Sequence, residues 1–178
     1  AARFREALRC DAVISTGGVS VGDHDWLKQV LAGLGGEMRL WRIRMRPGAP
    51  LAFATVGGRP IFALPGNPVS TLVTFEQFVR PGLLRMMGHR RVYRPVEPAV
   101  LDESYEKPAG RAHFVRLVLE RRADGLHARP TGEQASNILT KLLEWRRLMS
   151  YLEQSTRYTP HDRRLGGRYR YHRHPEML

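Results

Sequence analysis

The chain has 178 residues, of which 42% are hydrophobic and 26% are charged, as expected for a globular protein of one or two small domains. No apolar run approaches the ~20 residues that span a bilayer, and no signal peptide opens the sequence, so we expect no membrane partner and a cytoplasmic location. The single cysteine, Cys10, excludes an internal disulfide framework. The net charge of +12 is divided between the body of the chain and a basic C-terminal tail, and a moderately basic body suits a small anionic ligand as well as a polyanion.

The first elements predicted along the chain are a strand, a glycine-rich loop and a helix, which follow a helical end at residues 1–9. Residues 11–15 form an apolar run typical of a buried strand, and residues 16–24 contain three glycines. Asp25 is a helix start residue, and we expect it to cap the helix that follows. This order of elements brings backbone N–H groups and a helix N-terminus toward an anionic ligand, although the same pattern also occurs as a plain turn.

The predicted helix has one buried face, since apolar residues recur at i, i+3, i+4 and i+7 from Leu27, and it ends at Gly35. Residues 37–46 then alternate as a single strand. The alternation slips at Trp41 and Arg42, which indicates a bulge or a bend at that point.

A β-hairpin and a tight loop come next. Residues 51–56 and 61–64 are predicted to pair as the hairpin, joined through two glycines. In the loop at residues 65–68, Asn67 is placed to cap the following helix and Pro68 to occupy its first position. Such a loop ends a strand and starts a helix within a few residues.

The helix after this loop carries an apolar stripe and ends at Gly88, and Pro81 is expected to kink or restart it. Residues 1–90 thus form an α/β domain. A doubly wound sheet needs several βα units, so we expect this domain to be partial, with its N-terminal part missing.

From Val92 onward the pattern changes to short strands, at 96–101, 114–120 and 126–129, which predict a small all-β domain over residues 91–140. Beyond it, residues 141–178 form an atypical basic tail. Helical spacing of apolar residues predicts a helix at 142–152, and few apolar residues follow, so the rest of the tail is expected to be disordered.

Five sequence elements in register carry a resemblance to a known family. They are Thr16-Gly17-Gly18-Val19-Ser20-Val21-Gly22-Asp23-His24-Asp25, Arg46-Pro47-Gly48-Ala49-Pro50, Leu64-Pro65-Gly66-Asn67-Pro68-Val69-Ser70, Gly110-Arg111 with Phe114 and Arg116, and Gln134-Ala135-Ser136. Over residues 1–140 their order and spacing resemble the molybdopterin molybdenumtransferases, which include bacterial MoeA and the E domain of gephyrin. The resemblance implies a partial MogA/MoaB-like doubly wound domain followed by a small β domain.

For function, the resemblance implies molybdenum cofactor biosynthesis. In this family adenylylated molybdopterin and molybdate are the substrates, AMP is released, and Mg²⁺ assists. The resemblance further implies a molybdopterin adenylyltransferase as the pathway partner and a homodimer for the intact family protein.

The resemblance also assigns site residues. It places Asp25, Arg42, Arg46 and Ser136 at the catalytic site, with Asp25 as the metal ligand. It places ten residues at the pterin: Thr16, Gly17, Gly18, Val19, Ser20, Gly22, Pro65, Gly66, Asn67 and Pro68.

Simpler interpretations stand beside these roles. Asp25 can be a helix cap alone, Ser136 a turn serine, and the arginines at 39, 42, 44 and 46 a solvated strand face. Arg42 and Arg46 align with lysines in the family pattern, and arginine keeps the charge but brings a larger bidentate group. Arg111 and Arg116 can face the ligand or form ion pairs with Glu103 and Glu120, and the structural role is favoured.

Other functions remain open at this point. They are a pterin adenylyltransferase or nucleotide-hydrolysing relative, a fragment that binds molybdopterin without catalysis, and a nucleic-acid binder acting through the tail. The tail has no recognised nucleic-acid motif, so nucleic acid is not expected as a partner. The tail departs from the family pattern after Thr140, and a changed reading frame or a genuine variant would each explain this.

Overall fold

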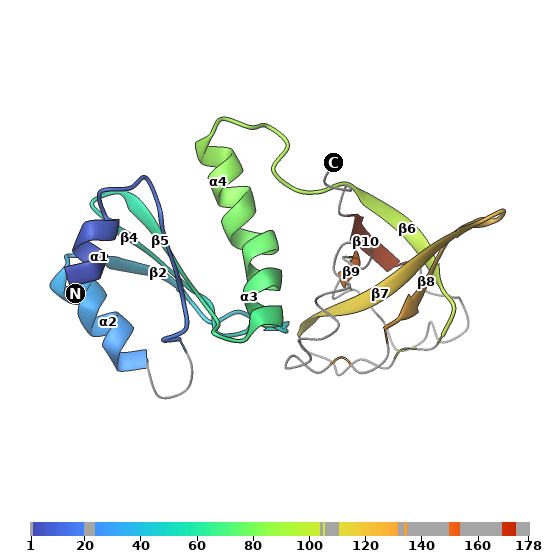
Figure 1. The fold of residues 1–178 in the computed structure, drawn as a ribbon, viewed down its shortest axis with the longest axis horizontal. Helices are drawn as coiled ribbons and strands as arrows, with labels where there is room; N and C mark the ends of the chain where they lie inside the picture. Colours follow the sequence, from blue (N-terminus) through green and yellow to red (C-terminus); the bar gives the residue numbers. More distant parts are fainter. Residues whose placement is uncertain are drawn as a thin grey trace. The chain divides into compact units, whose positions relative to one another are not determined.

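The computed structural model describes residues 2–19, 24–103, 105, 111–131, 134, 150–153 and 169–173. The chain divides into two compact units. The α/β unit comprises Ala1–Ile43 and Gly48–Val92, and the β unit comprises Arg44–Pro47 and Tyr93–Leu178. Each unit is described by itself below (Figure 1).

The α/β unit is built on a four-stranded mixed sheet. Its strands, in spatial order, are β1 (Val13–Thr16), β5 (Arg59–Leu64), β4 (Ala52–Val56) and β2 (Glu37–Trp41). β1 and β5 run parallel, whereas β4 is antiparallel to both β5 and β2. The predicted hairpin is therefore confirmed as β4 and β5.

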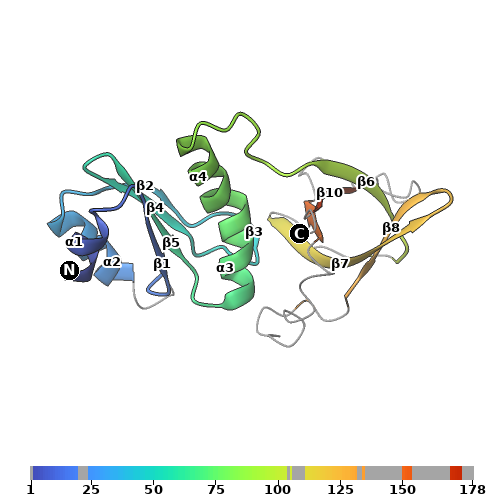
Figure 2. The ribbon, with the colours of Figure 1, turned by 45° about the horizontal axis from the view of Figure 1, so that its top comes forward.

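Helices cover both faces of this sheet (Figures 1 and 2). On one face lie α1 (Ala2–Ala7) and α2 (His24–Gly33), whose apolar side chains share a core with alternate residues of β4 and β5. On the other face a continuous helical segment packs against the intervening residues of the same strands. The two-residue period of a strand explains why adjacent side chains enter different cores.

The second helical layer consists of α3 (Pro68–Thr74), the π-helical turn η1 (Phe75–Val79) and α4 (Arg80–Met86). Pro81 lies in the first turn of α4. A proline has no N–H to donate to the preceding turn of a helix. The segment stays continuous, and the kink or restart expected at Pro81 takes the form of a π-helical turn directly before α4, where the segment departs from α geometry.

The prediction of one strand over residues 37–46 is wrong. β2 ends at Trp41, and Arg42 adopts a left-handed conformation with φ 61°. The short strand β3 (Met45–Arg46) then pairs in parallel with a strand of the β unit. The register shift in β2 lies between Met38 and Leu40, before the predicted position. A left-handed residue turns the chain out of its ladder. The bend expected where the alternation slips, at Trp41 and Arg42, is therefore confirmed, although the continuation of the same strand beyond it is not.

The β unit contains the three strands predicted from the sequence. They are β6 (Val96–Leu101), β7 (Ala112–Arg122) and β8 (Gly125–Pro130). β7 and β8 form an antiparallel hairpin, and β6 pairs in parallel with β8. Their core is made by small and aliphatic side chains: Ala99, Val115, Leu117, Leu126 and Ala128.

Two strands from the tail join this sheet, in contrast to the predicted helix and disordered segment. β9 (Ser150–Glu153) pairs with β7, and β10 (Tyr169–Arg173) pairs with both β6 and β9. The helix predicted for 142–152 is therefore wrong for its last three residues, and residues 142–149 lie outside the described part. The edges of the β unit's sheet supply backbone hydrogen-bond partners, and this pairing outweighs the local helical spacing of the tail residues.

Candidate functional site

Two loops meet at one edge of the sheet in the α/β unit. Because β1 and β5 are parallel, their carboxyl ends lie at the same edge, where ligands of open α/β sheets commonly bind. Thr16 and Leu64 are register partners at these ends. The Gly17 N–H donates a hydrogen bond to the Leu64 carbonyl oxygen at 3.0 Å, so the glycine loop and the loop at residues 65–68 start side by side.

The glycines allow these loops to approach closely. A Cβ atom built on Gly66 would lie 3.5 Å from the Gly17 Cα atom and 3.9 Å from the Gly17 nitrogen. Gly17 and Gly18 have φ values of 84° and 72°, a region that side chains with a Cβ rarely adopt. Around an added Cβ at either of these two positions, the described residues leave at least 4 Å of open space. The loop surface is therefore open to a ligand at these glycines.

Val19 lies within the glycine loop, is 1% exposed and belongs to the core of the α/β unit. Ser20, Gly22 and the predicted catalytic Ser136 lie outside the described residues. Helix α2 begins at His24, so Asp25 occupies its first turn rather than the predicted cap position. With Asp25 as the cap, the predicted helix would begin at Trp26, two residues later than the observed start, which is within the usual uncertainty of helix ends.

The loop at residues 65–68 is fixed by the start of α3. The Asn67 Oδ1 atom accepts a hydrogen bond from the Ser70 N–H at 3.3 Å, and Pro68 opens the helix, as predicted. The Thr71 hydroxyl lies 2.9 Å from the Asn67 carbonyl oxygen and also contacts the carbonyl oxygen of Pro65. Pro65 is buried, whereas Gly66 is exposed. The loop thus presents Gly66 outward on a rigid base.

Replacement of Asn67 is expected to show how much its helix cap stabilises the α/β unit. Asn67→Ala removes the cap and should lower the free energy of unfolding by about 1 kcal/mol, measured by urea unfolding. Asn67→Ser keeps a side-chain acceptor and should retain most of that stability. Equal stability of the two variants would show that the cap contributes little.

The two candidate molybdate ligands, Arg42 and Arg46, are both exposed but belong to different units. Arg42 follows β2, and its N–H donates to the Leu51 carbonyl oxygen at 2.9 Å. Arg46 lies on β3 in the β unit. The interpretation of the four arginines as one strand face is therefore wrong, because no single strand carries them. Its other part is confirmed, since all four are exposed to solvent.

Arg46 is accompanied by aromatic and basic groups that the sequence did not single out. Its register partner on β7 is His113, which is buried. The Tyr105 hydroxyl lies 3.5 Å from the His113 Nδ1 atom, and the ring centroids are 5.7 Å apart. Burial raises the pKa of Tyr105, and the positive charges of Arg46 and Arg116 oppose that shift. This part of the β unit is therefore a positively charged environment with a hydroxyl group.

Gln134, from the last of the five sequence elements, is hydrogen-bonded to the same strand, β7. Its Oε1 atom accepts from the Arg116 N–H at 2.8 Å, and its Nε2 group donates to the Arg116 carbonyl oxygen at 3.2 Å. The expected pairing of Glu120 with Arg116 is not the one observed, since Glu120 pairs with Arg122 at 2.6 Å. No local motif marks Tyr105 or His113, so only strand pairing could reveal them.

Within the described ranges, no group of three or more His, Cys, Asp or Glu side chains is placed to hold a metal ion. The same residues include no helix long and apolar enough to cross a membrane.

Two family models match the chain. Residues 1–85 match a probable molybdopterin binding domain, and residues 98–144 match the MoeA C-terminal region, domain IV. The chain belongs to the MoeA family. The two matched regions fall in the α/β unit and in the β unit, respectively, and they confirm the fold class predicted from the sequence.

Relatives of this MoeA-family chain include molybdopterin molybdenumtransferase 2 of Mycobacterium tuberculosis H37Rv, 40% identical over 124 residues, which are 67% of this chain and 31% of the relative. The Bacillus subtilis molybdopterin molybdenumtransferase is 33% identical over 144 residues, 80% of this chain and 34% of the relative. A solved molybdopterin biosynthesis moeA protein from Pyrococcus horikosii superposes with a TM-score of 0.67 at 28% identity, covering 87% of this chain and 36% of that one. The chain therefore spans about a third of the length of these relatives.

Proposed function

We propose that this chain supplies the pterin-binding and oxyanion-binding portion of a molybdopterin molybdenumtransferase. The reaction inserts molybdenum from molybdate into adenylylated molybdopterin and releases AMP. The observation that carries the proposal is the apposition of two glycine-containing loops at the carboxyl ends of β1 and β5, with the Gly17 N–H bonded to Leu64. The relatives' names and the match to a molybdopterin binding domain supply the ligand class.

In this proposal the two loops hold the phosphate-bearing end of the pterin. Backbone N–H groups of the glycine loop donate to phosphate oxygens, and the absence of a Cβ at Gly17, Gly18 and Gly66 lets the ligand come close. Thr16 pairs with Leu64 at the start of the glycine loop, and Val19 is buried within the loop. Asn67 and Pro68 fix the start of the second helical layer. Ser20, Gly22 and Pro65 complete the proposed pterin-binding set.

Asp25 is proposed to hold Mg²⁺. Asp25 belongs to the first turn of α2, the helix that follows the proposed phosphate-binding loop in the sequence. A carboxylate and a phosphate are both negatively charged, so a cation bound by both would offset their repulsion. Mg²⁺ commonly takes one or two carboxylates and completes its shell with water and substrate phosphates. The oxygen donor of Asp25 fits this chemistry, and bound Mg²⁺ would neutralise charge that develops on the phosphate.

Arg42 and Arg46 are proposed to bind molybdate, with Ser136 as a hydroxyl donor near it. Molybdate carries two negative charges, and a guanidinium presents two parallel N–H donors to such an oxyanion. The neighbourhood of Arg46, with Arg116 and the Tyr105 hydroxyl, is already positive. The β unit, matched by the MoeA C-terminal region, favours this function over adenylyltransferase activity or pterin binding without catalysis. In the same proposal a molybdopterin adenylyltransferase supplies the substrate, and the intact cytoplasmic protein is a homodimer.

Replacing Arg42 and Arg46 together with Gln is expected to weaken molybdate binding about 100-fold or more, since each hydrogen bond to a charged group contributes ~1.5–3 kcal/mol and about 1.4 kcal/mol is tenfold in affinity. Isothermal titration with molybdate and with tungstate measures the change. Binding to the native chain should also fall with added salt.

The matched control is Arg39→Gln with Arg44→Gln, which removes the same charge from the same segment. This control should keep molybdate affinity within a few-fold of the native value. Equal loss in both double variants would mean that only the overall charge of the segment matters and would contradict the assigned roles.

A further inference from the structure

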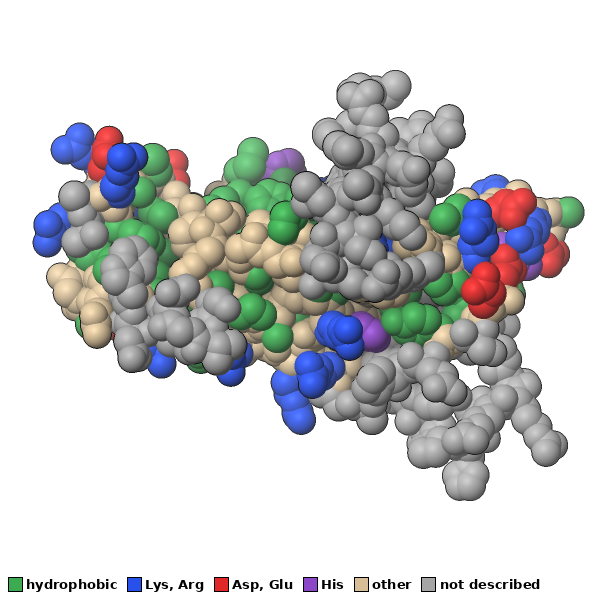
Figure 3. Space-filling view, turned by 60° about the horizontal axis from the view of Figure 1, so that its bottom comes forward, with side chains coloured by type: hydrophobic (Ala, Val, Ile, Leu, Met, Phe, Trp, Pro, Cys, Tyr) green, Lys and Arg blue, Asp and Glu red, His purple; other side chains and the backbone are tan. Residues whose placement is uncertain are grey.

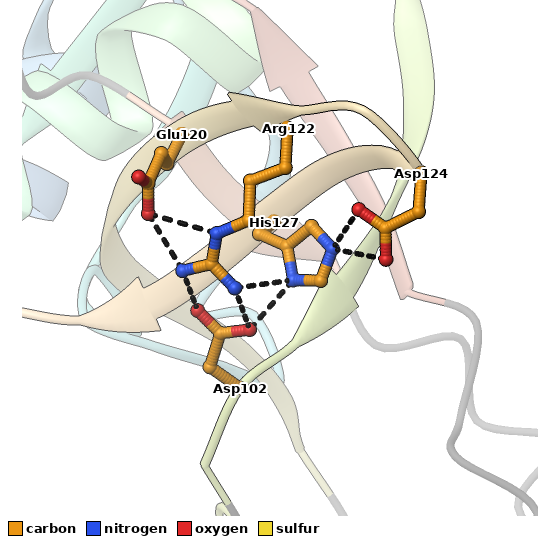
Figure 4. Close-up of polar contacts among 5 residues, drawn as sticks. All are labelled: Asp102, Glu120, Arg122, Asp124 and His127. Carbon is orange, nitrogen blue, oxygen red and sulfur yellow. Dashed lines mark hydrogen bonds and ion pairs between the residues drawn. The ribbon is translucent and has the colours of Figure 1, made fainter.

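A cluster of charged side chains in the β unit stands apart from the residues proposed for substrate binding. It is formed by Asp102 after β6, Glu120 and Arg122 on β7, Asp124 in the β7–β8 turn and His127 on β8 (Figure 4). Acidic and basic side chains lie beside one another at the right-hand end of the described surface, where the β7–β8 hairpin lies (Figure 3).

His127 is the centre of this cluster and is 7% exposed. Its Nδ1 atom lies 2.7 Å from the Asp102 Oδ1 atom. Its Nε2 atom lies 3.0 and 3.1 Å from the two carboxylate oxygens of Asp124. An ionised carboxylate only accepts hydrogen bonds, so both contacts are satisfied only when both ring nitrogens carry a proton. A neutral imidazole with its proton on Nε2 would keep the bond to Asp124, and its Nδ1 lone pair would accept from Arg122. That lone pair would then face the Asp102 carboxylate oxygen at 2.7 Å, and the bond between His127 and Asp102 would be lost.

Arg122 arranges the remaining charges. Its guanidinium donates to the Asp102 oxygens at 2.8 and 3.1 Å and to the Glu120 Oε2 atom at 2.6 and 3.0 Å. One of its nitrogens also lies 2.9 Å from the His127 Nδ1 atom, and this positive charge opposes protonation of the ring. Three carboxylates nevertheless surround one guanidinium and one imidazole, so the balance favours a charged ring.

The direction of the pKa shifts agrees with this geometry. The hydrogen bond to Asp102 raises the pKa of His127 most; burial lowers it, and the hydrogen bond to Asp124 raises it further. The hydrogen bond to His127 in turn holds the pKa of Asp102 and the pKa of Asp124 below their usual range.

We propose that His127 is a proton-dependent clamp that ties the end of β6 to the β7–β8 turn only while both of its ring nitrogens are protonated. The tie joins residues 25 and 3 positions apart along the chain. It also fixes the position of Asp102. Tyr105, whose hydroxyl contacts His113 on β7, follows Asp102 by three residues.

The clamp predicts how the stability of the β unit changes with pH. His127 binds its proton more tightly in the folded chain, so its contribution is fully present below the ordinary histidine pKa and is lost as pH rises through the raised value. Asp102 and Asp124 contribute above the ordinary carboxyl pKa, and their contribution is lost as pH falls through their lowered values. Stability is therefore expected to decline on both sides of a middle pH range.

The test follows the imidazole signals of the full chain by NMR as pH changes, with His127→Gln used to assign the signal. We expect His127 to titrate above the ordinary histidine value of about 6.5. Asp124→Asn should lower its pKa, and Asp102→Asn should lower it further. The Asp124 side chain is 72% exposed, so its replacement should leave folding intact, and this variant decides the test even where His127→Gln does not fold.

Urea unfolding between pH 6 and pH 9 gives a second measurement. The midpoint for the native chain should fall across this range, and the fall should be smaller in Asp124→Asn. His89→Gln, an exposed histidine of the α/β unit, serves as the control and should behave as the native chain. Titration of His127 at or below its ordinary value, or a pKa unchanged by Asp124→Asn, would overturn the proposal.

Discussion

Gly18→Val is expected to abolish molybdopterin binding. Gly18 has φ 72°, which a β-branched residue does not adopt without strain, and the added side chain would fill the open space beside the loop. Both effects remove the close backbone approach on which the proposed phosphate contacts depend. Fluorescence titration of the folded variant with molybdopterin measures the loss.

Gly88→Val is the matched control for this strain. Gly88 has φ 84°, is exposed after α4 and, like Gly18, has open space where a Cβ would be placed. Each substitution should reduce stability by about 1–2 kcal/mol, the cost of a left-handed residue with a Cβ. Only the change at Gly18 should affect binding. Native affinity in a folded Gly18→Val variant would contradict the assignment of the glycine loop to the pterin.

Asp25→Asn is expected to reduce molybdenum insertion at least ~100-fold, because loss of the carboxylate removes the proposed Mg²⁺ ligand. Stability should stay within about 1 kcal/mol of the native value, since a single charge near a helix N-terminus contributes only ~0.3–1 kcal/mol. Insertion can be measured in a chimera in which this chain replaces the matching third of the Bacillus subtilis relative.

Asp11→Asn is the control for this change, because Asp11 is an exposed aspartate before β1. It should leave insertion near the level of the unmodified chimera. If the Asp25→Asn chimera inserts molybdenum as fast as the unmodified chimera, and needs the same Mg²⁺ concentration to do so, then Asp25 serves only the start of α2.

The sequence by itself determined the features that depend on neighbouring residues. The two glycines between β4 and β5 predicted the hairpin, and Asn67 followed by Pro68 predicted the start of α3. The order of the glycine loop and the Pro-Gly-Asn-Pro loop indicated the family. A turn or a helix cap depends on only a few neighbouring residues, so the local sequence is enough to predict it.

Only the tertiary structure decided the features that depend on distant partners. The slip in alternation at Trp41 and Arg42 indicated a bulge or a bend, but only the structure shows that the left-handed Arg42 divides residues 37–46 between two sheets. Tail residues with helical spacing pair instead with β6 and β7. His127 meets Asp102 from a position 25 residues away, and Arg46 meets His113 through parallel strand pairing. These contacts form because the backbone groups at strand edges and buried charged side chains need partners. Those partners come from distant parts of the chain, so the periodicity of neighbouring residues does not predict them.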